Sequence, residues 1–118
     1  MKYFPQRKYS MKKDDLARLK HMLDAAKEAL SFISEKSEND LYKNRMLALS
    51  LIKDLEIIGE AANKVSEETR KIGSKIQWQD IVDMRNHLIH GYFDIDLNLV
   101  WNTVNKDIPP LITELQTE

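Results

Sequence analysis

Residues 47–62 read LALSLIKDLEIIGEAA, and this stretch carries the pattern that decides the fold. Apolar residues recur in it at steps of three and four, which is the period of an amphipathic α-helix. Leu49 and Ile57 add apolar bulk away from the main apolar face. A helix that is apolar on more than one side belongs at the centre of a bundle or at an interface. We therefore expect a central helix that ends near residue 65 and begins after a cap at Asn39 or Asp40.

The same helix carries a polar strip beside its apolar face. At 100° per residue, Glu56, Glu60 and Asn63 share that strip, so they can face a side chain of a neighbouring helix. Gly59 costs about 1 kcal/mol relative to alanine inside a helix, and its presence therefore predicts a close helix crossing.

Three further periodic segments surround the central helix. We expect helices over residues 14–36, from residue 78 or 79 to residue 91, and from residue 97 to the C-terminal end, with a short helical turn over 66–73. Asp96 is placed to cap the last of them, and Pro109 and Pro110 predict a kink over residues 106–108. Three glycines and three prolines in 118 residues leave few turns. The fold class is therefore all-α: an antiparallel four-helix bundle with a short extra helical turn and a kinked C-terminal helix.

Length and composition limit the possible functions. A chain of 118 residues makes one domain, and a formal net charge of −1 argues against a simple nucleic-acid-coating protein. No cysteine is present, which removes thiol chemistry and suits the cytoplasm. We expect no membrane association, because no uncharged apolar run approaches the roughly 18 residues that span a bilayer. Residues 1–10 contain basic residues and no acid, so we expect a basic arm there, followed by a single domain over residues 11–118.

One group of residues has side chains suited to catalysis. Residues 85–92 read RNHLIHGY and place a fixed cation, Arg85, five residues before His90 and seven before Tyr92. On a helical wheel Arg85 falls in the middle of the apolar stripe, so it needs a carboxylate, a wet cleft or an anion. Histidine can take the proton of a ribose 2′-hydroxyl or give one to the 5′-oxygen that leaves. Arginine can bind the phosphate through two hydrogen bonds and stabilise the negative charge that develops in the transition state.

Other interpretations of these residues remain open. A purely structural role would put Arg85 in a buried salt bridge, with His90 as a capping residue. A metal site is a poorer rival, because His87 and His90 have no carboxylate pair at matched positions. We therefore expect neither a metal nor a cofactor, and Glu56, Glu60 and Asn86 are the residues expected to support the site.

The RNHLIHGY motif resembles the signature of the HEPN superfamily of all-helical domains, many of which are metal-independent ribonucleases. The segments KKDDLARLKHMLDAAKEAL, LEIIGEAANKVSEETR and IQWQDIVDMRNHLIHGYFDIDLNLVWNTVNKDIPPL resemble its HepT-like branch, over about residues 11–118. The resemblance implies a ribonuclease toxin whose catalytic residues are Arg85 and His90. It also implies an MntA-type nucleotidyltransferase antitoxin as partner, which would inactivate the toxin by moving AMP from ATP onto Tyr92.

The chemistry also predicts a homodimer. Attack by a 2′-hydroxyl profits from one base and one acid, yet each chain offers a single motif histidine, with His87 as a fallback that faces solvent. A two-fold interface along the second and third helices, or the third and fourth, would bring His90 of two chains to one cleft. The alternative function is a non-catalytic helical subunit that binds a nucleotide or a nucleotidyltransferase, and a helical scaffold with an accidental motif is the third possibility.

Overall fold

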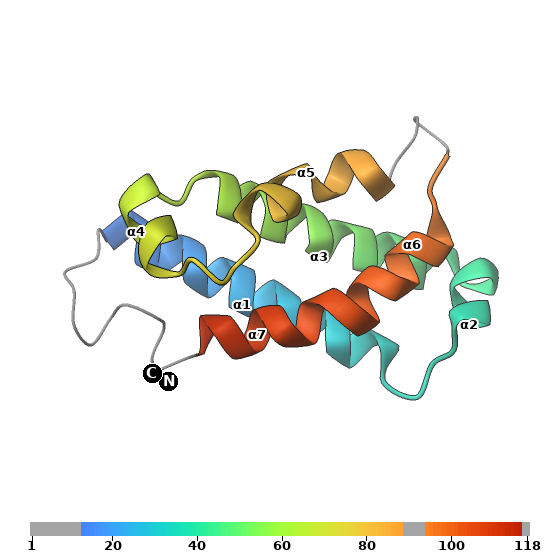
Figure 1. Cartoon of the computed structure of the whole chain (residues 1–118). Coiled ribbons are helices and arrows are strands. Elements are labelled where there is room, and N and C mark those ends of the chain that lie inside the picture. The colour runs from blue at the N-terminus through green and yellow to red at the C-terminus, as the bar shows by residue number, and fades with distance from the viewer. Residues whose placement is uncertain (1–12, 89–93, 117–118) are drawn as a thin grey trace.

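The computed structural model describes residues 13–88 and 94–116, and in these ranges the chain is helical (Figure 1). The order of elements is α1 (Lys13–Ile33), α2 (Glu38–Lys43), α3 (Arg45–Asn63), α4 (Glu67–Ile72), α5 (Trp78–Leu88), α6 (Leu97–Asn102), the π-helix η1 (Thr103–Asp107) and α7 (Ile108–Leu115). The predicted all-α class is confirmed.

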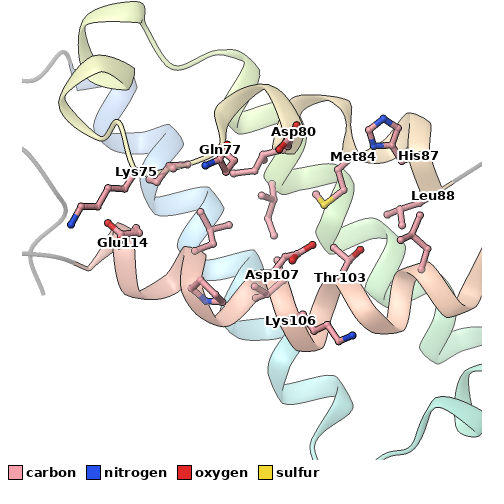
Figure 2. A pocket seen from close by; sticks show the side chains of 17 residues that line it. Lys75, Gln77, Asp80, Met84, His87, Leu88, Thr103, Lys106, Asp107 and Glu114 are labelled. Carbon is pink, nitrogen blue, oxygen red and sulfur yellow. The ribbon is translucent and has the colours of Figure 1, made fainter.

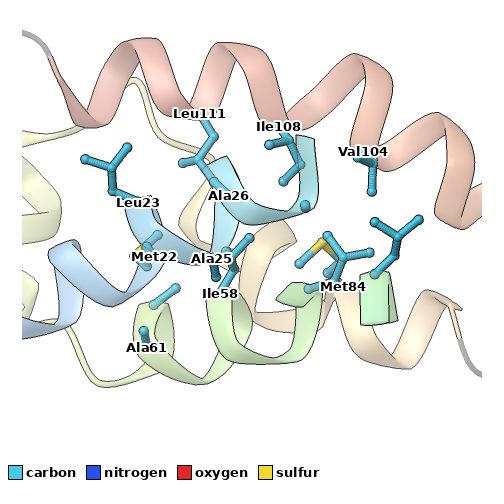
Figure 3. Close-up of a cluster of buried hydrophobic side chains, with 14 of the residues drawn as sticks. Met22, Leu23, Ala25, Ala26, Ile58, Ala61, Met84, Val104, Ile108 and Leu111 are labelled. Atoms are coloured by element: carbon cyan, nitrogen blue, oxygen red, sulfur yellow. The ribbon is translucent and has the colours of Figure 1, made fainter. Parts of the chain in front are cut away.

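Helix α3 is central, as its apolar pattern predicts. It packs antiparallel to α1 on one side and to α5 on the other, while α1 also contacts α7. Their apolar faces meet in a core that includes Met22, Ile58 and Ile108 (Figure 3). Burial of this apolar surface is the main term that stabilises the bundle.

The expected central helix is in fact two helices. Its first turns form the separate α2, and the chain bends at Asn44, whose backbone is extended with φ −121° and ψ 95°. The side chain of Asn44 accepts a hydrogen bond from the backbone N–H of Leu47 at 3.1 Å and so caps α3. The predicted cap at Asn39 or Asp40 is wrong. Ser37 is the N-cap of α2, and Asp40 instead accepts from the Ser37 backbone N–H at 2.7 Å.

The first helix is shorter than expected and is held at its start. It ends at Ile33 rather than near residue 36, and Glu35 follows with a positive φ of 62°. Near its beginning, the buried carboxylate of Asp15 accepts hydrogen bonds from Ser66 and from the Thr69 hydroxyl. These bonds tie α1 to the N-terminal end of α4, the short helical turn that the sequence predicts.

The C-terminal helical segment changes pitch where the two prolines predict a break. Asp96 caps α6 by accepting from the Leu99 backbone N–H at 3.0 Å, as expected. The π-turn of η1 follows, closed by a bond from the Ile108 N–H to the Thr103 carbonyl. Pro109 and Pro110 then occupy the first turn of α7, where their missing N–H groups are not needed.

The crossing of α3 and α5 is close because Gly59 has no side chain. A Cβ atom added there would lie 3.1 Å from the backbone oxygen of Ile81. The predicted close crossing is confirmed, and it sets the distance between the helices that carry the candidate site. On its other side, α5 stands apart from η1 and α7, with a groove between them.

Candidate active site on helices α3 and α5

Glu56, on the polar strip of α3, forms an ion pair with Arg85 of α5. The Nε atom of Arg85 lies 3.6 Å from Oε1 of Glu56, with 57% of the Arg85 side chain and 24% of the Glu56 side chain exposed. The antiparallel packing brings the two residues opposite each other, about one turn from Gly59. Glu56 therefore forms its ion pair at the Nε atom of the guanidinium, and more than half of the Arg85 side chain stays exposed.

Arg85 does not lie in the buried stripe of its helix, which corrects the expectation from the helical wheel. The buried residues of α5 are Trp78, Met84 and Leu88. The helix turns this face towards α3 and the C-terminal helices, so Ile81 and Val82 are only partly covered and Arg85 falls at the edge. An edge position keeps the guanidinium hydrated and avoids the cost of burying a charge. The buried salt bridge of the structural interpretation is therefore not formed.

The other supporting residues lie around this pair. Glu60 is exposed one turn further along α3, and Asn86 is exposed next to Arg85. Within residues 13–88 and 94–116 the structure gives neither of them an ion pair or a side-chain hydrogen bond. Of the three residues expected to support Arg85, Glu56 is thus the one in contact with it.

His90 and Tyr92 lie outside the described residues. The described residues nearest to them in the sequence are Leu88 and Asp94, and the Asp96 backbone N–H donates to the Leu88 carbonyl at 2.9 Å.

His87 is exposed, as expected, but it lines a groove on the opposite edge of α5 from Glu56. This groove has a volume of about 370 Å³ and runs between α5 and the η1–α7 segment (Figure 2). Its floor is apolar and includes Ile58 and Met84, while Asp80, Lys106 and Glu114 stand on its rim. The sequence does not indicate this groove, because it depends on how far α5 stands from α7.

Helix α3 also carries a buried acid, Asp54, which the sequence analysis did not single out. Asp54 is 2% exposed, and its Oδ2 atom is buried without a hydrogen-bond partner. Burial, together with the neighbouring carboxyl group of Glu28 on α1, raises the pKa of Asp54 to about 7. A signal was available, because Asp54 interrupts the apolar run LIKDLEI on the same face as Leu47 and Leu51.

No three His, Asp or Glu side chains in the described ranges are arranged to hold a metal ion. No helix in the same ranges is both long and apolar enough to cross a membrane.

The fold and the Arg85–Glu56 ion pair define a class of protein. It is a small helical domain in which an exposed arginine, paired with a glutamate, precedes a histidine by five residues in the sequence. A family model described as "Ribonuclease HepT-like" matches residues 22–118. The chain belongs to this family. The predicted resemblance and the predicted enzyme class, ribonuclease, are thereby confirmed.

Individual relatives agree with the family. The chain is 34% identical over 105 residues to "Putative RNase MJ1380" of Methanocaldococcus jannaschii, covering 89% of this chain and 96% of the relative. It is 33% identical over 96 residues to "Probable ribonuclease HepT" of Thermococcus cleftensis, covering 78% and 87%. A third relative, "Putative RNase TTE0752" of Caldanaerobacter subterraneus subsp. tengcongensis, is 36% identical over 93 residues, covering 79% and 83%. No solved structure matches the chain.

Proposed function

We propose that this chain is a metal-independent endoribonuclease and the toxin of a toxin–antitoxin pair in the cytoplasm. The observation that carries the proposal is the position of Arg85. Its guanidinium is exposed and fixed by Glu56 at 3.6 Å, one turn before the end of α5, where the motif continues with His90.

The proposed reaction is attack of a ribose 2′-oxygen on the adjacent phosphorus. His90 takes the 2′-hydroxyl proton, the bond from phosphorus to the 5′-oxygen breaks, and a protonated histidine gives that oxygen its proton. The products are a 2′,3′-cyclic phosphate and a free 5′-hydroxyl. Arg85 binds the non-bridging oxygens with its outer NH groups and offsets the charge that develops on them. No step needs a metal ion.

A homodimer completes this proposal, since base and acid can then come from two copies of His90. The outer face of α3 supports such an interface. Met46 is 79% exposed and Leu49 is 43% exposed, and at 100° per residue Leu49 lies only about 20° from Glu56 around the helix. The sequence leaves two interfaces open, one along the second and third predicted helices and one along the third and fourth. An apolar patch beside the site favours the first of them, along α3 and α5.

Regulation follows from the position of Tyr92 in the motif. We propose that a nucleotidyltransferase antitoxin of the MntA type transfers AMP from ATP to the Tyr92 hydroxyl and releases pyrophosphate. The added phosphate is negative and lies two residues from His90, so it would repel the RNA phosphate from Arg85.

A direct test is cleavage of single-stranded RNA by the purified chain in the presence of EDTA. We expect Arg85→Ala and His90→Ala to lower the rate by at least about a hundredfold. The matched controls are Arg45→Ala and His21→Ala, which remove the same exposed side-chain types elsewhere and should leave the rate near that of the wild type. Cleavage that requires a divalent ion, or that survives both motif substitutions in folded protein, would refute the proposal.

The non-catalytic alternative has one observation in its favour, the groove of about 370 Å³ between α5 and α7. A partner-binding subunit would use this groove and would not need the Glu56–Arg85 pair. If the purified chain cuts no RNA but a nucleotidyltransferase still binds it, and Lys106→Glu on the exposed rim of the groove abolishes that binding, the alternative is correct.

A further inference from the structure

The groove between α5 and the η1–α7 segment has no part in the proposed cleavage reaction. Its volume of about 370 Å³ falls in the range of pockets that hold small organic molecules, about 300–1,000 Å³. Each side chain of its apolar floor is at most 9% exposed, and these are Ile58, Met84, Leu88, Ile108 and Leu111. A thin or flat apolar group can reach this floor, whereas a whole helix, about 10 Å across, would rest on the rim.

Thr103 is the polar side chain that distinguishes this groove. It is 7% exposed and lines the groove, and its hydroxyl group has no hydrogen bond within the described part of the chain. Other helical hydroxyl groups bond to the preceding turn: Ser50 donates to the Met46 carbonyl at 2.7 Å and Thr113 to the Pro109 carbonyl at 3.2 Å. The hydroxyl group of Thr103 is therefore available to a ligand in the groove.

The π-turn of η1 places an acid beside this hydroxyl group. Thr103 and Asp107 are the first and last residues of η1, about one turn apart, so they share a face of the helix. Figure 2 shows the hydroxyl group of Thr103 and the carboxyl group of Asp107 on the side of η1 that faces α5. Such π-turns are rare and frequently occur at functional sites.

The charges around the groove favour a cation. Asp80 on α5, Asp107 on η1 and Glu114 on α7 all line it. Lys75 and Lys106 line it too, but Figure 2 shows Lys75 extending past the end of the groove and Lys106 pointing away from α5. Within residues 13–88 and 94–116 no ion pair joins these lysines to these acids. The groove therefore offers hydrogen-bond acceptors with negative charge above an apolar floor.

We propose that this groove binds a small apolar molecule that carries a protonated amino group. The apolar body covers Met84 and Ile108 on the floor. The ammonium group donates hydrogen bonds to the Thr103 hydroxyl and to the Asp107 carboxylate, and Asp80 supplies a second negative charge from the α5 rim. This site is separate from Arg85 and does not depend on nuclease activity.

The test is an NMR titration of the full chain, with isotope-labelled methionine methyl groups and phenethylamine as the probe. Met84 reports on the floor of the groove, while Met46 lies on α3 outside it and is 79% exposed. We expect the Met84 resonance to shift with a Kd of about 1 mM or lower. The Met46 resonance should not shift, which controls for non-specific contact with exposed apolar side chains.

Two analogues with the same phenyl body separate the contribution of charge from that of apolar contact. Phenethyl alcohol is neutral and hydrocinnamate is an anion. Because neither provides a charged donor for the two acceptors, each should bind at least about tenfold more weakly than phenethylamine.

Variants identify the acceptors. Asp107→Asn and Thr103→Val should each raise the Kd of phenethylamine by about fivefold or more. Thr103→Val should not lower the urea midpoint of unfolding, because the hydroxyl group that it removes makes no hydrogen bond in the described ranges. The matched controls are Asp14→Asn on α1 and Thr113→Val on α7, which make the same changes outside the groove and should leave the Kd unchanged.

Three results would overturn the proposal. The first is equal affinity for phenethylamine and its two analogues. The second is a Met84 resonance that does not move at about 10 mM phenethylamine, or that moves no more than Met46 does. The third is wild-type affinity in both Thr103→Val and Asp107→Asn when these variants are folded.

Discussion

Glu56 of α3 holds the Nε atom of Arg85 of α5 at 3.6 Å, at the edge of both helices rather than in the core. This arrangement fixes an arginine without neutralising its outer face. An exposed pair of this kind contributes little to stability, with a typical value of about 0–1 kcal/mol. Its consequence is therefore positional, because it holds the guanidinium of Arg85 beside α3, one turn before Leu88 at the end of α5.

Replacement of the acid should expose this positioning role. We expect Glu56→Gln to lower the rate of RNA cleavage by about tenfold to a hundredfold, since a misplaced catalytic group costs that much. The free energy of unfolding should change by less than about 1 kcal/mol. Glu60→Gln, one turn away on the same strip and without an ion pair to Arg85, is the control and should cleave like the wild type. Glu56→Asp should restore part of the rate, and a fully active Glu56→Gln would contradict the assignment.

The close crossing at Gly59 should resist any larger side chain. Gly59→Val adds atoms against the Ile81 backbone oxygen, which an added Cβ already approaches to 3.1 Å. We expect a loss of about 1–3 kcal/mol in the free energy of unfolding, measured with urea, because overpacking forces the backbones apart. Lys53→Val puts the same side chain on the exposed face of α3 and controls for the helix propensity of valine. Equal stability of the two variants would show that the crossing tolerates the added bulk.

The raised pKa of Asp54 makes stability depend on pH in an unusual direction. Its pKa is about 7 in the folded chain, against an ordinary value of 3.8. Between these values the folded state binds the proton that the unfolded state has lost, so stability falls as pH rises from about 4 to about 7. Urea unfolding at pH 5 and pH 8 should therefore give the lower midpoint at pH 8. In Asp54→Asn the difference should shrink, while the exposed Asp80→Asn should keep it.

The proposed dimer interface depends on the apolar patch of α3. We expect light scattering to give twice the chain mass of 13.8 kDa for the wild type, and the mass of one chain when Met46→Glu and Leu49→Glu are combined. Ile72→Glu changes another exposed apolar residue, on α4, and should remain dimeric. If the two chains share one catalytic cleft, the monomeric Met46→Glu, Leu49→Glu variant should also lose RNA cleavage. A monomeric wild type at micromolar concentration would exclude the two-chain site.

Tyr92→Phe removes the proposed AMP acceptor and keeps the ring. The variant should cut RNA like the wild type but stay active after incubation with the nucleotidyltransferase and ATP. Intact-mass measurement should find an AMP adduct on the wild type and on Tyr42→Phe, whose substitution lies on α2, and none on Tyr92→Phe. If the adduct persists on Tyr92→Phe, or if the modified wild type still cleaves, this mechanism is wrong.

The sequence by itself determined the helical class, the approximate helices and the family. Amphipathic periodicity is local and follows from the geometry of the helix, so Leu51, Leu55 and Ile58 already marked the core face of α3. Gly59 predicted a close helix crossing for an equally local reason, because glycine destabilises a helix interior and its presence there indicates that a side chain would not fit. The motif from Arg85 to Tyr92 indicated three candidate site residues by residue type and spacing, and the resemblance to the HepT-like branch implied their roles.

Only the tertiary structure decided which faces are covered. The helical wheel put Arg85 in the apolar stripe, but the angle at which α5 meets α3 leaves it at the edge, paired with Glu56 and not with Glu60. The break at Asn44 also required the packed chain, because α2 and α3 read as one periodic run. Asp54 is a buried acid with a raised pKa only because the packed helices cover it and place Glu28 of α1 beside it. A side chain's charge, burial and partners are set by neighbours distant in sequence, and a single helix's pattern does not contain them.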